Sequence, residues 1–134
     1  MPDRYALRLH TALASNTGGP YVTPWDEVVV PTAGTIRSAW AVAVSLSSNG
    51  RQNSVDIYNQ SDAPAAGSNS SATVLVSPIT LSNNRDAAEG TISEAGARVD
   101  AGDVLQLRSY ADTSGGLPAF IGLTATVEIE RDPD

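Results

Sequence analysis

Alternation of bulky and small residues is the clearest pattern in this chain, and it is strongest over residues 35–46. A repeat of two residues is the period of a β-strand, whose successive side chains point to opposite faces. We therefore expect a strand here, with its bulkier face toward the core and its smaller face free for close approach of another strand or subunit. The bulkier set is Ile36, Ser38, Trp40, Val42, Val44 and Leu46, and the smaller set is Thr35, Arg37, Ala39, Ala41, Ala43 and Ser45.

A turn signal follows this strand. Residues 47–50 read Ser-Ser-Asn-Gly, and Asn-Gly is typical of tight β-turns because both residues tolerate a positive φ. Residues 52–58 then alternate again, with Val55 and Ile57 on one face. The pattern predicts a β-hairpin over residues 35–58.

Further strands are indicated toward both ends of the chain. Residues 103–111 and 119–130 alternate in the same way, and a polar, Gly-rich segment at residues 111–116 joins them. Shorter apolar runs predict strands at residues 28–30, 73–76 and 79–81, and an N-terminal strand is expected where Tyr5, Leu7 and Leu9 alternate with Arg4, Arg8 and His10.

No segment shows the 3.6-residue period of an amphipathic helix, and Gly- and Pro-rich stretches separate the apolar runs. Roughly seven to nine short strands in one chain predict an all-β sandwich or barrel. We expect an antiparallel sandwich of about eight strands. Its predicted core is Trp40, Val42, Val44, Val55, Ile57, Leu105, Leu107, Ile121, Leu123 and Val127.

The first 24 residues show a weaker strand pattern than the rest of the chain. After Leu13 they contain few large apolar side chains, and Gly18, Gly19, Pro20 and Pro24 interrupt any regular strand. We therefore expect residues 1–24 to form either an N-terminal arm or an edge strand, and residues 25–134 to form the sandwich domain.

Composition narrows the function classes. The 134 residues include no cysteine and no lysine, which excludes disulfides, thiolate chemistry and a Schiff-base lysine. The net charge of −7 is opposite to that of a protein that follows nucleic-acid phosphates. No run approaches the about 20 apolar residues of a membrane helix, and the N-terminus does not read as a signal peptide. We expect neither a nucleic-acid nor a membrane partner.

Candidate catalytic and metal-binding residues are sparse. His10 is the single histidine, so a Ser-His-Asp triad would have to use it, and its place beside Arg8 favours a surface or partner-facing role. Asp100 and Asp103 flank Ala101-Gly102. Two readings of this segment are a calcium loop and a tight turn in which Gly102 has positive φ and the carboxylates accept backbone N–H groups. The turn is favoured because calcium-loop spacing is missing. We expect no catalytic, cofactor or metal site.

The C-terminal half resembles a known family. It runs from Val99 through Asp100-Ala101-Gly102-Asp103-Val104-Leu105-Gln106-Leu107 to the long alternating segment 119–129, and a Gly34-Thr35-Ile36 step stands upstream. This V-x-A-G-D-x-L-x-L step before a long last strand resembles jelly-roll domains of the tumour-necrosis-factor-like kind. More narrowly, it resembles the small jelly-roll decoration (cement) proteins of tailed-phage capsids. The resemblance covers roughly residues 30–130 and carries no catalytic residue.

The resemblance implies a function. It implies a non-enzymatic homotrimer that binds the major capsid protein and stabilises the outer surface of a virion, made in the host cytoplasm. The alternative is a fibre-tip or receptor-binding jelly roll that recognises a surface glycan. For the capsid contact we expect the N-terminal residues Arg4, Tyr5, Leu7, Arg8 and Leu9, and for the trimer contact the small face Ala39, Ala41 and Ala43.

Overall fold

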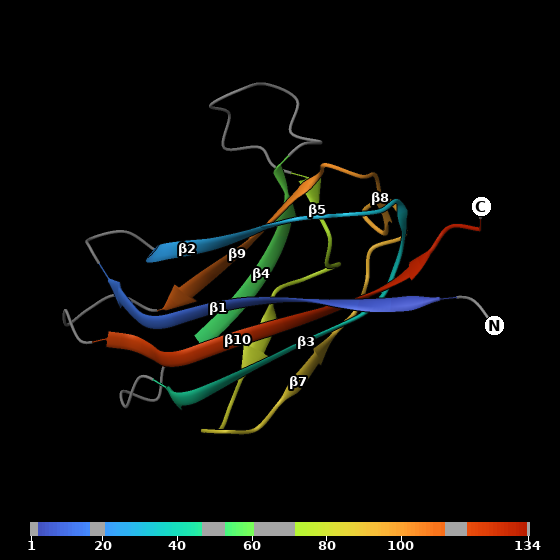
Figure 1. Ribbon diagram of the computed structural model, residues 1–134. Helices are drawn as coiled ribbons and strands as arrows, with labels where there is room; N and C mark the ends of the chain where they lie inside the picture. The colour runs from blue at the N-terminus through green and yellow to red at the C-terminus, as the bar shows by residue number, and fades with distance from the viewer. Residues whose placement is uncertain (1–2, 17–20, 47–52, 61–71, 112–117, 134) are drawn as a thin grey trace.

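The protein is an all-β structure of two antiparallel sheets (Figure 1). The computed structural model describes residues 3–16, 21–46, 53–60, 72–111 and 118–133, and within these ranges it leaves out the side chains of residues 11–25, 46, 53, 72, 109–111 and 118–121. No α-helix occurs in the part of the chain so described.

Ten strands form in the described residues, and two of them, β7 and β8, lie where the sequence predicts no strand. They are β1 (Arg4–Asn16), β2 (Tyr21–Val29), β3 (Gly34–Leu46), β4 (Asn53–Asn59), β5 (Ala72–Thr73), β6 (Ile79–Leu81), β7 (Ala88–Gly90), β8 (Arg98–Val99), β9 (Val104–Ala111) and β10 (Pro118–Arg131).

Each sheet is built from strands distant in sequence. One sheet has the order β1-β10-β3-β7, with β8 also on β3, and the other has the order β2-β9-β4, with β5 and β6 on β4. In Figure 1 the blue β1, red β10 and teal β3 lie side by side, and β9 and β4 cross them. The two sheets join where β1 meets β2 at Ser15 and Asn16. A bridge between Leu75 and Ile92 links them a second time.

The pairing is nested along the chain. The first strand pairs with the last, β1 with β10, and the second pairs with the next to last, β2 with β9. Further inward, β3 pairs with β7, and β4 pairs with β5 and β6. Long-range pairs of this kind bring both chain ends to the same end of the molecule, as Figure 1 shows.

A single hydrophobic core lies between the sheets. Six residues of the predicted core are buried there, which confirms that part of the prediction: Val55, Ile57, Leu105, Leu107, Leu123 and Val127. The side chain of Ile121 lies outside the described residues. Leu9, Ile36, Leu75 and Ile129 are further fully buried members.

The facing of β3 differs from the prediction because the strand contains a β-bulge. Ile36 pairs with Ile129 and Ser38 pairs with Glu128, so Arg37 is an extra residue that has no partner on β10. An extra residue inverts the alternation beyond it. Ile36 therefore faces the core, but after the bulge the small residues face inward and the bulky ones outward.

The inversion overturns two predictions. Trp40 and Val44 are 44% and 46% exposed, and Val42 is half-buried, so none of the three belongs to the core. The trimer-contact prediction also fails in this structure, because its three residues are buried inside the protomer's own core. These are Ala39, Ala41 and Ala43.

The predicted hairpin over residues 35–58 does not form. Both strands exist, but β3 pairs with β10, β7 and β8, whereas β4 pairs with β9, β5 and β6. Alternation indicates which face of a strand is apolar and carries no information about its neighbour. With the strands in opposite sheets, the apolar faces of both meet in the same core.

The structure favours one of the two N-terminal alternatives. β1 pairs with β10 from Arg4 to Ser15 and with β2 only at Ser15 and Asn16, so it is not a separate arm, and its N-terminal part is an edge of the sheet. The register runs from Arg4 opposite Glu130 to Ser15 opposite Pro118. The proposed domain boundary at residues 24 and 25 falls inside β2. Leu9, at 0% exposure, shows why β1 is required: it fills the core opposite Ala125.

The turn reading of Asp100 to Asp103 is confirmed. Gly102 has a φ of 91°, and Asp103 Oδ2 accepts hydrogen bonds from the Asp100 N–H and from Asn59 Nδ2, both at 2.9 Å. The turn also binds the end of β2, because Val30 N–H donates to the Asp103 carbonyl at 2.7 Å. Its carboxylate is therefore committed to holding the strand ends together.

Candidate functional site

The outward side of the β1-β10-β3-β7 sheet gathers the best candidate residues for a contact with another molecule. We call it the outer face. It consists of Arg4, Ala6, Arg8 and His10 on β1, Gly122, Thr124, Thr126 and Glu128 on β10, and Ser38, Trp40, Val42 and Val44 on β3.

Trp40, Val42 and Val44 form an apolar stripe on this face. Trp40 and Val44 are two of the four large hydrophobic side chains exposed in the described residues. Alternate residues of one strand share a face, so the three side chains stand in a row. Tryptophan is strongly enriched among the residues that dominate protein interfaces. The stripe is therefore a candidate contact rather than a scattered set of surface residues.

Gly122 shapes the surface beside this stripe. It has a φ of 63° and lies next to Val44, whose Cγ2 would be 2.8 Å from a Cβ built on the glycine. Both the backbone conformation and the close neighbour favour glycine here. With Thr124 and Thr126 in the same strand, the centre of the outer face carries no large side chain, which leaves a smooth surface between Trp40 and β1.

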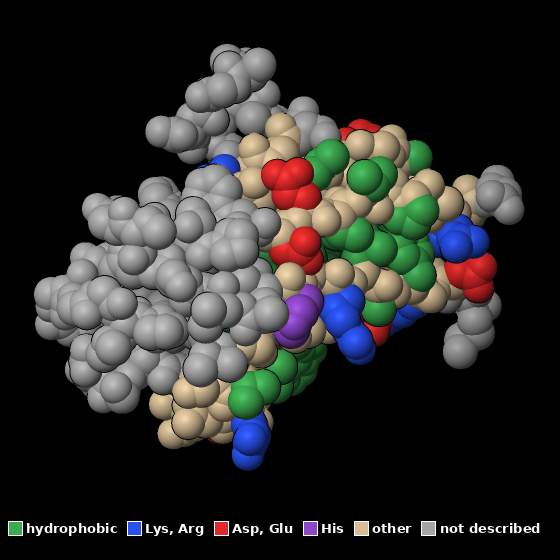
Figure 2. All heavy atoms as spheres, turned by 60° about the vertical axis from the view of Figure 1, so that its left-hand side comes forward, with side chains coloured by type: hydrophobic (Ala, Val, Ile, Leu, Met, Phe, Trp, Pro, Cys, Tyr) green, Lys and Arg blue, Asp and Glu red, His purple; other side chains and the backbone are tan. Residues whose placement is uncertain are grey.

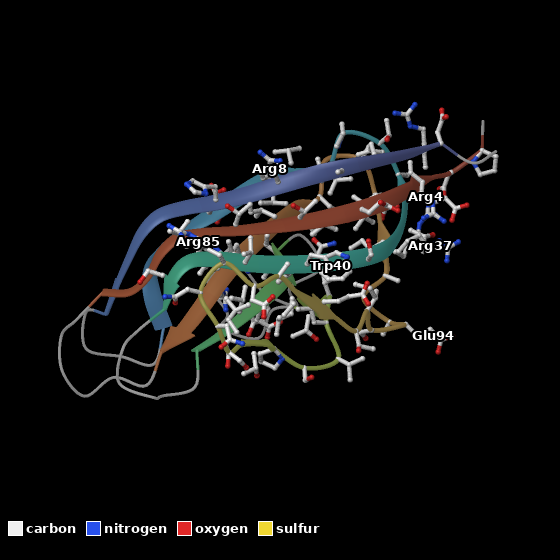
Figure 3. All side chains as sticks on the ribbon, turned by 90° about the horizontal axis from the view of Figure 1, so that it is seen from below. Arg4, Arg8, Arg37, Trp40, Arg85 and Glu94 are labelled. Carbon is white, nitrogen blue, oxygen red and sulfur yellow. The ribbon has the colours of Figure 1, made fainter. Side chains whose placement is uncertain are left out.

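Charged residues border the face. Arg4 Nη1 donates to Glu128 Oε1 at 2.7 Å, and Arg37 Nε donates to Glu130 Oε2. Arg8 is exposed, and no carboxylate within the described ranges pairs with it. Figure 3 shows Arg8 on β1 and Trp40 on β3, with Arg4 and Arg37 toward the end of the sheet where the termini lie. Arg8 is therefore the basic residue of β1 that is open to an acidic partner.

His10 is a surface residue and is not arranged as a member of a catalytic triad. Its Nδ1 is 2.9 Å from Thr124 Oγ1, across the β1–β10 pair. Asp26 is nearby, but its Oδ2 accepts the His10 backbone N–H at 2.7 Å and not a ring nitrogen. A triad needs the carboxylate on the imidazole ring. Figure 2 shows this single histidine at the surface, next to basic and acidic side chains.

A second polar cluster lies on the β2-β9-β4 sheet. Gln106 Nε2 donates to Glu27 Oε1 at 2.8 Å, and Gln106 Oε1 accepts from Gln60 Nε2 at 3.0 Å and from Arg108 Nε. The Arg108 guanidinium also lies over the Tyr58 ring, 4.2 Å from its centroid. The Gln106 amide thus joins side chains of β2, of β9 and of Gln60, the residue that follows β4. We interpret the cluster as structural, because its polar groups form hydrogen bonds with one another.

Asp56 belongs to the same region. It is buried, lies opposite Arg108 across β4 and β9, and its Oδ1 accepts the Ile57 N–H at 2.9 Å. Burial raises the pKa of this carboxyl, although the hydrogen bonds from Ile57 and Tyr58 and the charge of Arg108 act in the opposite direction. Desolvation penalises the charged carboxylate more than these contacts favour it.

The residues expected at a capsid contact divide between two faces of β1. Arg4 and Arg8 lie on the outer face, and Tyr5, Leu7 and Leu9 lie on the core side. Leu9 is fully buried, and Leu7 and Tyr5 pack partly against the core. The Tyr5 hydroxyl donates to the Thr32 carbonyl at 2.6 Å. Of these five residues the two arginines are exposed, Tyr5 and Leu7 are half-buried, and Leu9 is fully buried.

The exposed stripe was missed from the sequence. Alternation was followed through residues 35–46 without interruption, which placed Trp40 in the core. Arg37 and Ser38 are consecutive polar residues between Ile36 and Ala39. A polar pair inside an alternating strand is compatible with a bulge, and this signal marks where the phase changes.

No group of three or more histidine, cysteine, aspartate or glutamate side chains that could hold a metal ion occurs among the described residues. None of the described residues form a helix long and apolar enough to cross a membrane. No protein-family model matches this chain, and no curated protein matches it.

Proposed function

We propose that the fold is a jelly roll. Nested pairing of first with last and second with next-to-last strands generates two sheets whose strands alternate between the layers, which is the arrangement of a jelly roll. The strand orders β1-β10-β3-β7 and β2-β9-β4 follow this scheme. A jelly roll is also the fold that the family resemblance implies, and the V-x-A-G-D step that carries this resemblance runs from β8 into the turn before β9.

On this basis we propose that the protein is a virion decoration protein. It binds the major capsid protein on the outer surface of a tailed-phage capsid, as a trimer, and stabilises the shell without catalysing a reaction. The observation that carries the proposal is the nested strand order together with the resemblance over residues 30–130. The outer face supplies a docking surface, with the Trp40 stripe as its apolar centre and Arg8 at its border.

Repetition makes such a contact effective. Each trimer would present three copies of the outer face to a symmetric lattice, so individually weak contacts combine through a high effective concentration. Trp40 is exposed in the isolated chain. Burial of its ring against the capsid would therefore contribute hydrophobic free energy to binding.

The test is reconstitution on particles that lack the protein. We expect the purified chain to restore three-fold-symmetric density on the outside of the capsid in electron cryomicroscopy, and to raise the temperature at which the particle releases its DNA. Trp40→Ala and Arg8→Glu should weaken binding at least tenfold, whereas the matched surface variant Val76→Ala should not. Absence of the chain from purified particles, by mass spectrometry, would contradict the proposal.

The exposed tryptophan also supports a second candidate, a fibre-tip domain that binds a surface glycan. An accessible indole ring is a surface on which a sugar ring can stack, and Trp40 has this exposure on a smooth sheet. The same particles distinguish the candidates. Labelling at the tail tip, with Trp40-dependent binding to host-cell polysaccharide, would favour the glycan-binding function over the decoration function.

A further inference from the structure

The free edge of β1 is the feature that the proposed function leaves unused. β1 pairs with β10 on one side along its whole length, but it pairs with β2 on the other side only at Ser15 and Asn16. Between Arg4 and Leu9 no strand of the described residues pairs with the β2 side of β1. An unpaired strand edge is a template for addition of another strand.

The hydrogen-bonding groups on this edge can be assigned. Along a strand the backbone groups of successive residues point to opposite sides. The Asp3 carbonyl accepts from the Arg131 N–H at 2.8 Å, so odd-numbered residues point toward β10. The His10 N–H donates to Asp26 Oδ2 at 2.7 Å, so even-numbered residues point away from it. The N–H and C=O groups of Ala6 and Arg8 therefore face outward along the free edge.

The free edge of β1 is closed at its C-terminal end. At His10 the Asp26 carboxylate takes the position that an added strand would occupy, which stops pairing there. The edge of β3 on the other side of this sheet is covered by contrast: it is met in turn by β8, by β7 and by the Arg85 N–H, which donates to the Ala43 carbonyl at 2.7 Å. The open stretch is thus short, from Arg4 to Arg8.

Side chains around the open stretch define what would fit. On the core side, Leu7 and Val28 are only half-buried, although both pack against the core. On the outer side, Arg4, Ala6 and Arg8 are exposed. Figure 2 shows hydrophobic side chains at the surface on the side of the molecule where the histidine lies. An added strand would need apolar residues facing inward and acidic residues facing outward.

A second copy of this chain is a poor occupant. Antiparallel self-pairing centred on Ala6 would place Arg4 of one chain opposite Arg8 of the other, and like charges directly opposite destabilise a strand pair. The charges that disfavour self-pairing favour an acidic strand. Arg8 in particular has no carboxylate partner among the described residues.

We propose that the β1 edge from Arg4 to Arg8 is a docking site for an extended segment of a partner protein, which adds to the sheet as a strand with carboxylates opposite the arginines. Backbone hydrogen bonds to Ala6 and Arg8 give the segment its register. Its inward side chains cover Leu7 and Val28. This proposal is independent of the decoration function, since it requires only a partner with an acidic strand.

The test uses the full chain and two labelled peptides. One contains Glu-Val-Thr-Val-Glu and the other Lys-Val-Thr-Val-Lys, each flanked by serines and blocked at both ends. We expect the acidic peptide to bind at least tenfold more tightly in fluorescence anisotropy, and Arg8→Glu to reverse the preference. Hydrogen exchange by NMR should show the Ala6 and Arg8 amides becoming protected when the acidic peptide binds, while the Leu7 amide is already protected.

Ala6→Pro is the matched backbone variant. It removes only an N–H that faces the free edge, so the thermal midpoint should stay near that of the parent chain while acidic-peptide binding falls at least tenfold. Equal binding of both peptides, no binding of either, or no added protection at Ala6 and Arg8 would overturn the proposal. Protection of these amides that rises with protein concentration alone would assign the edge to a second copy and overturn it as well.

Discussion

At the scale of single residues, the bulge at Arg37 decides which side chains β3 contributes to the core. It turns Ala39, Ala41 and Ala43 inward and leaves Trp40 on the surface. Small inward residues let β3 lie close to the opposite sheet, because close-packed interiors leave no room for larger ones. The same extra residue thus builds the core and the apolar stripe.

Trp40 and Ile57 provide a direct test of this assignment. Trp40→Ala should cost at most about 1 kcal/mol of unfolding free energy, since the ring is 44% exposed. Ile57→Ala removes a fully buried side chain and should cost about 2–5 kcal/mol. Urea unfolding followed by far-UV circular dichroism measures both. A loss for Trp40→Ala as large as that for Ile57→Ala would place the tryptophan in the core after all.

Asp56 predicts a pH dependence of stability. Its pKa is raised from the ordinary 3.8 by burial, so between 3.8 and the raised value the folded state binds more protons than the unfolded state. Unfolding free energy from this group therefore falls as pH rises through that window, and is highest below it. Asp56→Asn, which keeps the acceptor for the Ile57 N–H, should flatten the decline in stability as the pH rises above 3.8. Equal slopes for variant and parent in urea titrations at several pH values would exclude Asp56 as the cause.

At the scale of strands, close contacts set where glycine is required. A Cβ at Gly34, the first residue of β3, would collide with the Glu130 carbonyl oxygen and come within 2.8 Å of Ile129 Cγ2. Neither the paired backbone of β10 nor a buried isoleucine can move away easily. Gly102 differs, because nothing lies within 4 Å of its Cβ position and only its positive φ favours glycine.

These two glycines give a matched pair of variants. Gly102→Ala should cost about 1 kcal/mol, the strain of a left-handed conformation. Gly34→Ala should cost clearly more, because the β3–β10 pairing must shift as well. Thermal unfolding of both variants in one buffer gives the ranking. The reverse order would mean that β3 and β10 are not in register as the structure shows.

At the scale of the whole molecule, the two sheets depend on one core. Leu9 of β1 and Leu105 of β9 belong to the same buried cluster although they lie in different sheets. Neither sheet can keep its apolar face from water without the other. Unfolding should therefore be a single cooperative process rather than two.

Removal of residues 1–15 tests this dependence. The truncation deletes nearly all of β1, which leaves the edge of β10 unpaired and removes the buried Leu9 side chain from the core. We expect the truncated chain to lose both sheets, seen as loss of the far-UV β signal and of amide dispersion in NMR spectra. A shortened chain that remains folded and melts cooperatively would restore the view of residues 1–24 as a separable arm.

The sequence alone determined the local structure of this protein. Alternation located β1, β3, β4, β9 and β10 to within a few residues, and Gly102 with its flanking aspartates identified a turn. These features follow from interactions between residues near in sequence: a period of two makes one face apolar, and glycine accepts a positive φ.

Only the tertiary structure decided which strands are neighbours and which faces are free. The pairing of β1 with β10 joins residues more than a hundred positions apart, and alternation within each strand is the same whatever its partner. The bulge at Arg37 is a feature of the register between β3 and β10, so the Arg37-Ser38 pair is compatible with a bulge, but only the pairing shows that Trp40 is exposed. The open edge of β1 likewise exists because β1 pairs with β2 only at Ser15 and Asn16 and not in its N-terminal part. This is a property of the assembled sandwich.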